Sequence, residues 1–82
     1  MKEIIISIYD GGYWWSIRID GKTWTRTDNS IYPYPYAPTK RISNLYQKFK
    51  DSHELFPKFL KRRFDRIIIC EDGSIDIWEK RK

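Results

Sequence analysis

The sequence predicts a single α+β domain, in which an antiparallel sheet of about five strands carries two short helices packed on one face. Three observations lead to this prediction. Asp-Gly or Gly-Gly pairs separate alternating apolar runs at both ends of the chain, a Tyr-Pro tract follows the first runs, and residues 40–64 carry apolar side chains at helical spacing. The expected element order is β-β-β-α-α-β-β. With 82 residues the chain has room for one modest core.

Residues 1–28 are predicted to form a three-stranded meander with strands at 3–9, 13–19 and 22–27. Asp-Gly between alternating runs favours a hairpin, because a type I′ turn needs positive φ at both central residues. A two-residue loop at Asp20-Gly21 pairs the second strand with the third as follows: Ile19 with Lys22, Ile17 with Trp24 and Trp15 with Arg26. A loop at Gly11-Gly12 pairs the first strand with the second: Ile8 with Trp15, Ile6 with Ile17 and Ile4 with Ile19. Both registers put the same side chains on one face, which a slip of one residue would scatter. This core face consists of Ile4, Ile6, Ile8, Trp15, Ile17, Ile19 and Trp24.

Residues 29–39 are predicted to form a Tyr-Pro crossover, because alternating prolines block a helix or a central strand and favour extended polyproline II. The helical region, residues 40–64, follows with Thr39 as N-cap. One helix is expected at 40–50 and a second at 57–64, since Pro57 is tolerated at a helix start; a single helix kinked near 53–57 is the alternative. The inward side chains are Ile42, Leu45, Tyr46 and Phe49 on the first helix and Phe56, Phe59, Leu60 and Phe64 on the second.

Residues 66–79 are predicted to form a C-terminal hairpin around Asp72-Gly73. A two-residue loop pairs Cys70 with Ile75, Ile68 with Ile77 and Arg66 with Glu79. A three-residue loop with a bulge pairs Ile69 with Ile75 instead, and both registers remain open at this stage.

The positive charge lies mainly in the helical part of the chain. The net charge is +5, and residues 29–66 carry nine basic and three acidic side chains. The cations opposite or beside the apolar stripes are Lys58, Lys61, Arg62 and Arg63 on the second helix and Lys40, Arg41 and Lys48 on the first. They suggest a phosphate-contacting surface and hence a nucleic-acid-binding protein; a merely solvated helix face is the alternative. A winged-helix arrangement, with 57–64 as recognition helix and 71–74 as wing, is a further alternative.

The outer face of the meander is unusual for a half-exposed sheet, because it places Tyr9 beside Trp14 together with Arg18 and several hydroxyl groups. Such a face can stack bases of a single strand or form a subunit interface. We expect it to be covered by self-association or by the Tyr-Pro tract rather than by bases. The alternative function is therefore a protein–protein interaction module: a homodimer, or an inhibitor or adaptor from a mobile genetic element that acts on a host protein.

The chain is not expected to be an enzyme, to bind a metal or to need a cofactor. His53 is the sole histidine and Cys70 the sole cysteine, and Asp72 and Asp76 flank a turn that aspartates favour. No phosphate-binding glycine loop, metal-ligand cluster or serine-nucleophile signature is present.

A cytoplasmic location is expected, since one cysteine rules out an internal disulfide and no apolar run approaches the ~20 residues that span a bilayer. Valine is absent, alanine occurs once, and Ile, Lys, Tyr and Trp are abundant. This skew, with the tract IYPYPYAP, resembles the small orphan proteins of viruses and plasmids of thermophilic archaea. The resemblance is one of composition, no motif carries it, and it implies no activity.

Overall fold

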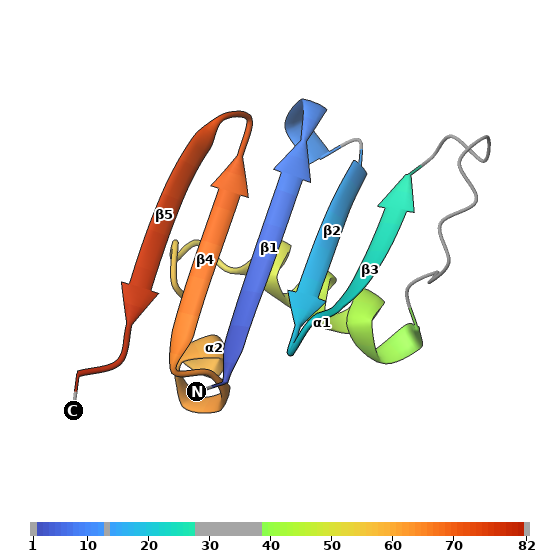
Figure 1. Ribbon diagram of the computed structural model, residues 1–82. Coiled ribbons are helices and arrows are strands. Elements are labelled where there is room, and N and C mark those ends of the chain that lie inside the picture. Colours follow the sequence, from blue (N-terminus) through green and yellow to red (C-terminus); the bar gives the residue numbers. More distant parts are fainter. Residues whose placement is uncertain (1, 13, 28–38, 82) are drawn as a thin grey trace.

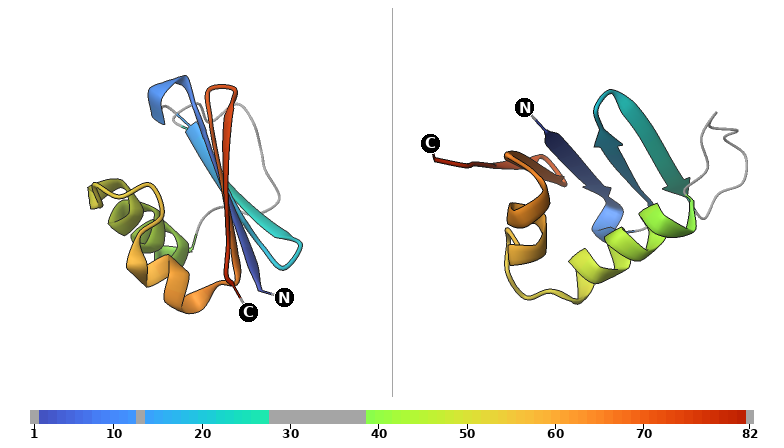
Figure 2. Two further views of the ribbon diagram at one scale, coloured as in Figure 1. Left: turned by 90° about the vertical axis from the view of Figure 1, so that its left-hand side faces the viewer. Right: turned by 90° about the horizontal axis from the view of Figure 1, so that it is seen from below.

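A five-stranded sheet with two helices on one face makes up the part of the chain that the computed structural model describes, residues 2–12, 14–27 and 39–81 (Figure 1). Seen along the sheet, both helices lie on the same side of it (Figure 2, left). The predicted α+β class and the order β-β-β-α-α-β-β are confirmed. The strands are β1 (Glu3–Tyr9), β2 (Trp14–Ile19), β3 (Lys22–Thr27), β4 (Arg66–Glu71) and β5 (Ser74–Glu79); the helices are α1 (Lys40–Asp51) and α2 (Lys58–Arg63).

The registers of the first two hairpins are those predicted from the turn residues, and the last hairpin, whose register the sequence left open, has the two-residue loop. Ile17 pairs with Trp24, Ile6 with Ile17, and Cys70 with Ile75, so the bulged alternative for the last hairpin is wrong. The Asp-Gly turns have positive φ at both central residues, with 48° and 82° in the β2–β3 turn and 46° and 90° in the β4–β5 turn. The β1–β2 connection is longer than a Gly-Gly pair, because a 3₁₀ turn over Asp10–Gly12 follows β1.

The prediction of a purely antiparallel sheet is wrong. The strand order is β3-β2-β1-β4-β5, and β4 lies beside β1 in parallel, with Ile5 opposite Ile68. Near the start of β1, the backbone N–H of Asp65 donates to the carbonyl of Lys2 at 2.8 Å, and the Lys2 N–H donates to the Asp65 carboxylate at 3.1 Å. These bonds join the beginnings of β1 and β4 at one end of the sheet, so the two strands run in the same direction.

A single apolar cluster lies between the sheet and the helices. Thr39 caps α1, since its Oγ1 accepts a hydrogen bond from the Ile42 N–H at 3.3 Å, and Pro57 precedes α2, so the helices are separate and not one kinked helix. In the helices and the residues next to α2, Ile42, Tyr46, Phe49, Leu60 and Phe64 are buried, while Leu45, Phe56 and Phe59 are half-buried against them. The buried strand residues are Ile4, Ile6, Ile8, Trp15, Ile17, Ile67 and Ile69, with Ile19, Trp24 and Trp78 at the margin.

The predicted Tyr-Pro crossover at 29–39 lies, apart from Thr39, outside the described residues. Its proposed contact with the outer sheet face therefore stays a prediction. Among the residues that are described, the helices cover only the face that carries the apolar cluster (Figure 2).

Candidate nucleic-acid interface

Seven of the eight cationic side chains on the helices form a set that we call the basic helical face; the eighth, Lys50, lines a different pocket at the end of α1. The apolar stripes of α1 and α2 are turned to the sheet, so the remaining positions point outward. All seven are exposed except Lys61, which is half-buried. The basic helical face consists of Lys40, Arg41 and Lys48 on α1 and Lys58, Lys61, Arg62 and Arg63 on α2.

The charges of the basic helical face are not neutralised by the described part of the chain, in which none of them forms an ion pair. The ion pairs found there join Arg66 to Glu3 and Glu79, with Nε–oxygen distances of 3.5 and 3.2 Å. Lys48 and Lys61 have aromatic partners instead: their ammonium groups lie 4.6 Å from the Phe59 ring centroid and 5.5 Å from that of Trp78. An aromatic ring holds a lysine without cancelling its charge, so these ammonium groups stay available to an anion.

The start of α1 and the end of α2 both contribute residues to a pocket of about 470 Å³, which we call the α1–α2 pocket. Arg41 and Arg63, which are 22 residues apart in the sequence, both line it. Lys2 adds a third cation and Asp20 the one carboxylate. The other lining residues are Thr39 and the apolar Ile19, Trp24, Ile42, Leu45 and Phe64.

Sequence reasoning selected Arg41 and Arg63 but did not place them together, and it missed Lys2 and Trp24 as site residues. The pocket is assembled from Lys2 before β1, the β2–β3 hairpin, and the two helices with their flanking residues. Since no motif spans these segments, the sequence carried no signal for their convergence.

The second predicted group lies on the opposite side of the sheet. Tyr9 and Trp14 stack there, with ring centroids 3.7 Å apart and planes 12° apart, and Arg18 is exposed. The parallel pairing of β4 with β1 extends this outer face by apolar side chains that the sequence reasoning did not assign to it. They are Ile68, Cys70, Ile75 and Ile77, of which Ile75 and Ile77 are 66% and 53% exposed.

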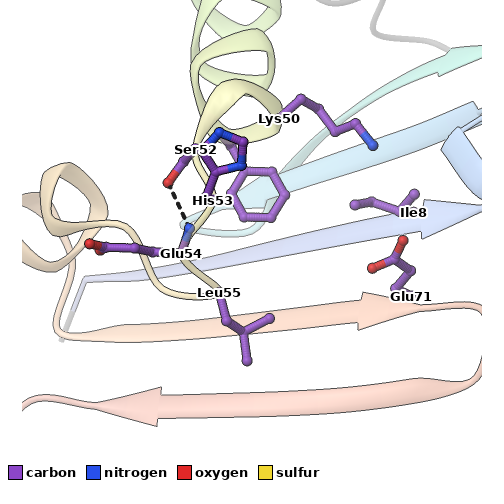
Figure 3. Close-up of a pocket in the computed structure, with 8 residues that line it drawn as sticks. Ile8, Lys50, Ser52, His53, Glu54, Leu55 and Glu71 are labelled. Atoms are coloured by element: carbon purple, nitrogen blue, oxygen red, sulfur yellow. Dashed lines mark hydrogen bonds between the residues drawn. The ribbon is translucent and has the colours of Figure 1, made fainter.

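A second pocket, of about 300 Å³, lies at the C-terminal end of α1 (Figure 3). Lys50, His53 and Glu71 line it, and the hydroxyl of Ser52 accepts a hydrogen bond from the Glu54 N–H at 3.2 Å. Cys70 belongs to the outer face, so the sheet separates it from His53 in the helical layer, and the two do not form a dyad.

The winged-helix alternative does not fit the arrangement of the elements. α2 lies where β4 begins, whereas the β4–β5 turn lies at the other end of β4 (Figure 1). Leu60, moreover, is fully buried, which fixes α2 against the sheet. A recognition helix and a wing that contact one duplex would have to lie on a common surface.

Across residues 2–12, 14–27 and 39–81, no three His, Cys, Asp or Glu side chains are grouped so as to hold a metal ion. None of the described helices has the length and apolar character needed to cross a bilayer. Comparison with protein-family models, curated proteins and solved structures finds no match for this chain.

Proposed function

We propose that this protein is a small non-enzymatic binding protein that contacts nucleic-acid phosphates through the basic helical face. The observation that carries the proposal is the set of seven helical cations without an ion-pair partner among the described residues. A surface of unpaired Lys and Arg attracts a polyanion, because each contacted phosphate releases condensed counterions.

The arrangement of the helices supports this proposal. α1 and α2 both lie over the same sheet face and form one helical layer (Figure 2), so their outward side chains lie on the same side of the sheet. A nucleic-acid strand that follows this layer meets cations from both helices, and Lys58 and Arg62 lie one turn apart on α2.

Fluorescence anisotropy with labelled single- and double-stranded oligonucleotides over a salt series tests the proposal. The expected slope of log K against log salt is about −0.9 per contacted phosphate for a duplex and about −0.7 for a single strand. A protein that shows no binding near ~50 mM salt, or binding that is independent of salt, would contradict the proposal.

A matched pair of charge reversals locates the surface. Arg62→Glu on α2 and Arg18→Glu on the outer sheet face change the net charge equally, and both side chains are exposed. We expect Arg62→Glu to weaken binding about tenfold and to reduce the salt slope, while Arg18→Glu has a clearly smaller effect. If Arg18→Glu weakens binding as much as Arg62→Glu, the basic helical face is not the specific contact surface.

A second candidate function is self-association through the outer sheet face, and the exposure of Ile75 and Ile77 favours it. Ile5 in β1 lies next to Ile68 in β4, and Ile68 pairs with Ile77, so an apolar row crosses three strands of this face. A parallel strand pair normally has both faces covered. A second copy would provide this cover, because two such faces bring an apolar row against an apolar row.

Light scattering of the wild type, Ile77→Lys and Trp14→Ala tests self-association. The expected result is a wild-type dimer that both substitutions dissociate, since they remove apolar contacts from the edge strand β5 and from β2 on the same face. The matched control is Ser74→Lys at the exposed beginning of β5, which should remain dimeric. A monomeric wild type at high concentration would rule out this candidate.

A further inference from the structure

The α1–α2 pocket combines an apolar interior with a cationic rim. Its apolar walls are Ile19, Trp24, Ile42, Leu45 and Phe64, contributed by both sides of the apolar cluster. Lys2, Arg41 and Arg63 also line it, against the single carboxylate of Asp20. A ligand that fits this composition has an apolar, planar part and a negatively charged part.

The cationic rim is poorly neutralised. Arg41 and Arg63 form no ion pair within the described residues, with Asp20 or with any other carboxylate, and both are exposed. The Lys2 ammonium lies 5.3 Å from the centroid of the Phe64 ring, which leaves its charge uncompensated. Three cations around one opening repel one another, and a bound anion relieves this repulsion.

The indole of Trp24, which lines the pocket, is only partly covered by the apolar cluster. Trp24 is half-buried at the margin of the apolar cluster, and the Lys22 ammonium lies 5.4 Å from its ring centroid. Indole is the side chain that stacks most favourably on planar groups, and stacking on a nucleobase tolerates any base.

The size of the pocket limits what enters it. Its volume of about 470 Å³ lies within the range of about 300–1,000 Å³ typical of small-molecule sites, and it is much too small for a duplex. A base inside a duplex is stacked and paired on both sides, whereas a base in a single strand is free to leave its neighbours.

We propose that the α1–α2 pocket binds one unstacked nucleotide of a single-stranded nucleic acid, with the base against Trp24 and the phosphate between Arg41 and Arg63. This inference rests on the proposed nucleic-acid-binding function and adds to it a preference for single strands. The remaining cations of the basic helical face then contact the neighbouring phosphates.

NMR titration of the ¹⁵N-labelled protein tests the pocket directly, with thymidine monophosphate, inorganic phosphate and a short oligothymidylate as separate probes. The expected result is that the nucleotide and the oligonucleotide shift the Trp24 indole N–H and the amide signals of Ile42 and Leu45. Inorganic phosphate should shift the amide signals near Arg41 without the indole signal, because it lacks a base.

Two double variants provide the matched comparison. Arg41→Gln with Arg63→Gln removes two charges from the pocket, and Lys58→Gln with Arg62→Gln removes two exposed charges from α2. We expect the pocket variant to bind oligothymidylate about tenfold more weakly than the α2 variant does, while both bind a duplex equally well. Equal losses for the single strand would overturn the inference.

The Trp24→Leu variant tests the base contact, and its NMR spectrum shows whether the variant is folded. If the variant is not folded, the arginine variants still test the pocket independently. The folded variant should bind oligothymidylate about tenfold more weakly and inorganic phosphate as well as the wild type does. Unchanged oligothymidylate binding would contradict the base contact.

The two proposals fail in different ways. Oligonucleotide binding that shifts only α2 signals, with the Trp24 indole unmoved, overturns the pocket and leaves the basic helical face intact. Mononucleotide binding at Trp24 without oligonucleotide binding overturns both the nucleic-acid-binding function and the preference for single strands, and leaves the pocket as a site for a free nucleotide. A tyrosine-phosphorylated peptide that shifts the indole signal where no nucleotide does would overturn both assignments in favour of a protein ligand.

Discussion

The indole of Trp15 in β2 and the phenol ring of Tyr46 in α1 stack face to face, with centroids 4.1 Å apart and planes 7° apart. Both residues are buried, so this contact joins the helical layer to the sheet inside the apolar cluster. The Tyr46 hydroxyl is buried without a hydrogen-bond partner among the described residues. The ring of Tyr46 therefore stabilises the fold through packing, while its hydroxyl pays a desolvation penalty.

Tyr46→Phe is expected to leave the free energy of unfolding unchanged or to raise it by up to about 1 kcal/mol, because it removes an unsatisfied polar group and keeps the ring. Tyr46→Ala should lower it by about 3–5 kcal/mol, since the stack on Trp15 is lost and a cavity remains. Urea denaturation followed by circular dichroism measures both. A loss above about 1 kcal/mol in the Phe variant would show that the hydroxyl has a stabilising partner.

Alkaline pH should destabilise the wild type more than Tyr46→Phe. Burial raises the pKa of Tyr46 above its usual value of 10.0, and the nearby Glu71 carboxylate raises it further. Above this usual value the unfolded chain has released the Tyr46 proton while the folded chain still holds it, so a further rise in pH favours unfolding. The stability that Tyr46 contributes is complete below pH 10 and is lost as pH rises through its folded-state pKa.

Urea titrations at several pH values on both sides of 10 measure this difference. Other tyrosines and lysines titrate in the same range, so the quantity of interest is the difference between the two proteins. Parallel stability curves for the wild type and Tyr46→Phe would show that the Tyr46 pKa is not raised.

The Asp72 carboxylate links two turns at the same end of the sheet. It accepts hydrogen bonds from the N–H groups of Asp10 at 2.9 Å and Gly11 at 3.4 Å, and the Asp72 N–H donates to the Ile8 carbonyl at 3.2 Å. Asp72→Ala should lower the free energy of unfolding by about 1–3 kcal/mol. The variant loses these bonds, and alanine tolerates the φ of 46° at this position less well than aspartate does.

Asp72→Asn separates the two effects, because asparagine also tolerates positive φ and keeps one acceptor oxygen. We expect it to lose less than half of what the alanine variant loses, as measured by urea denaturation. Equal losses in the two variants would show that the negative charge alone is important.

Leu60 and Leu55 form a matched pair of leucines on either side of Pro57. Leu60 is fully buried in α2, whereas Leu55 is 50% exposed before it. Leu60→Ala should lower the free energy of unfolding by about 2–5 kcal/mol, because it leaves a cavity under the sheet. Leu55→Ala should change it by less than about 1 kcal/mol. Similar losses in urea denaturation would contradict the packing of α2 described above.

The sequence by itself determined the local structure of this protein. The Gly11-Gly12 and Asp20-Gly21 pairs set the registers of the first two hairpins, because a short turn with positive φ allows few pairings, and the alternation of Ile and Trp then identified the core face. The register of the last hairpin was decided only by the structure. Thr39 and Pro57 marked the helix starts for an equally local reason: each acts on the backbone groups of the turn that follows.

Only the tertiary structure decided that β4 pairs with β1 in parallel, because hairpin signals describe neighbouring strands and these two are about 60 residues apart. The apolar runs Ile4–Ile6 and Ile67–Ile69 are typical of central strands, but they do not indicate which strands lie beside them in the sheet. The same holds for the candidate site. Arg41 and Arg63 were recognised as cations on two helices, and their meeting with Lys2 and Trp24 follows from how those helices pack on the sheet. Such contacts depend on the burial of apolar surface by segments far apart in the chain, and no short stretch of sequence encodes that.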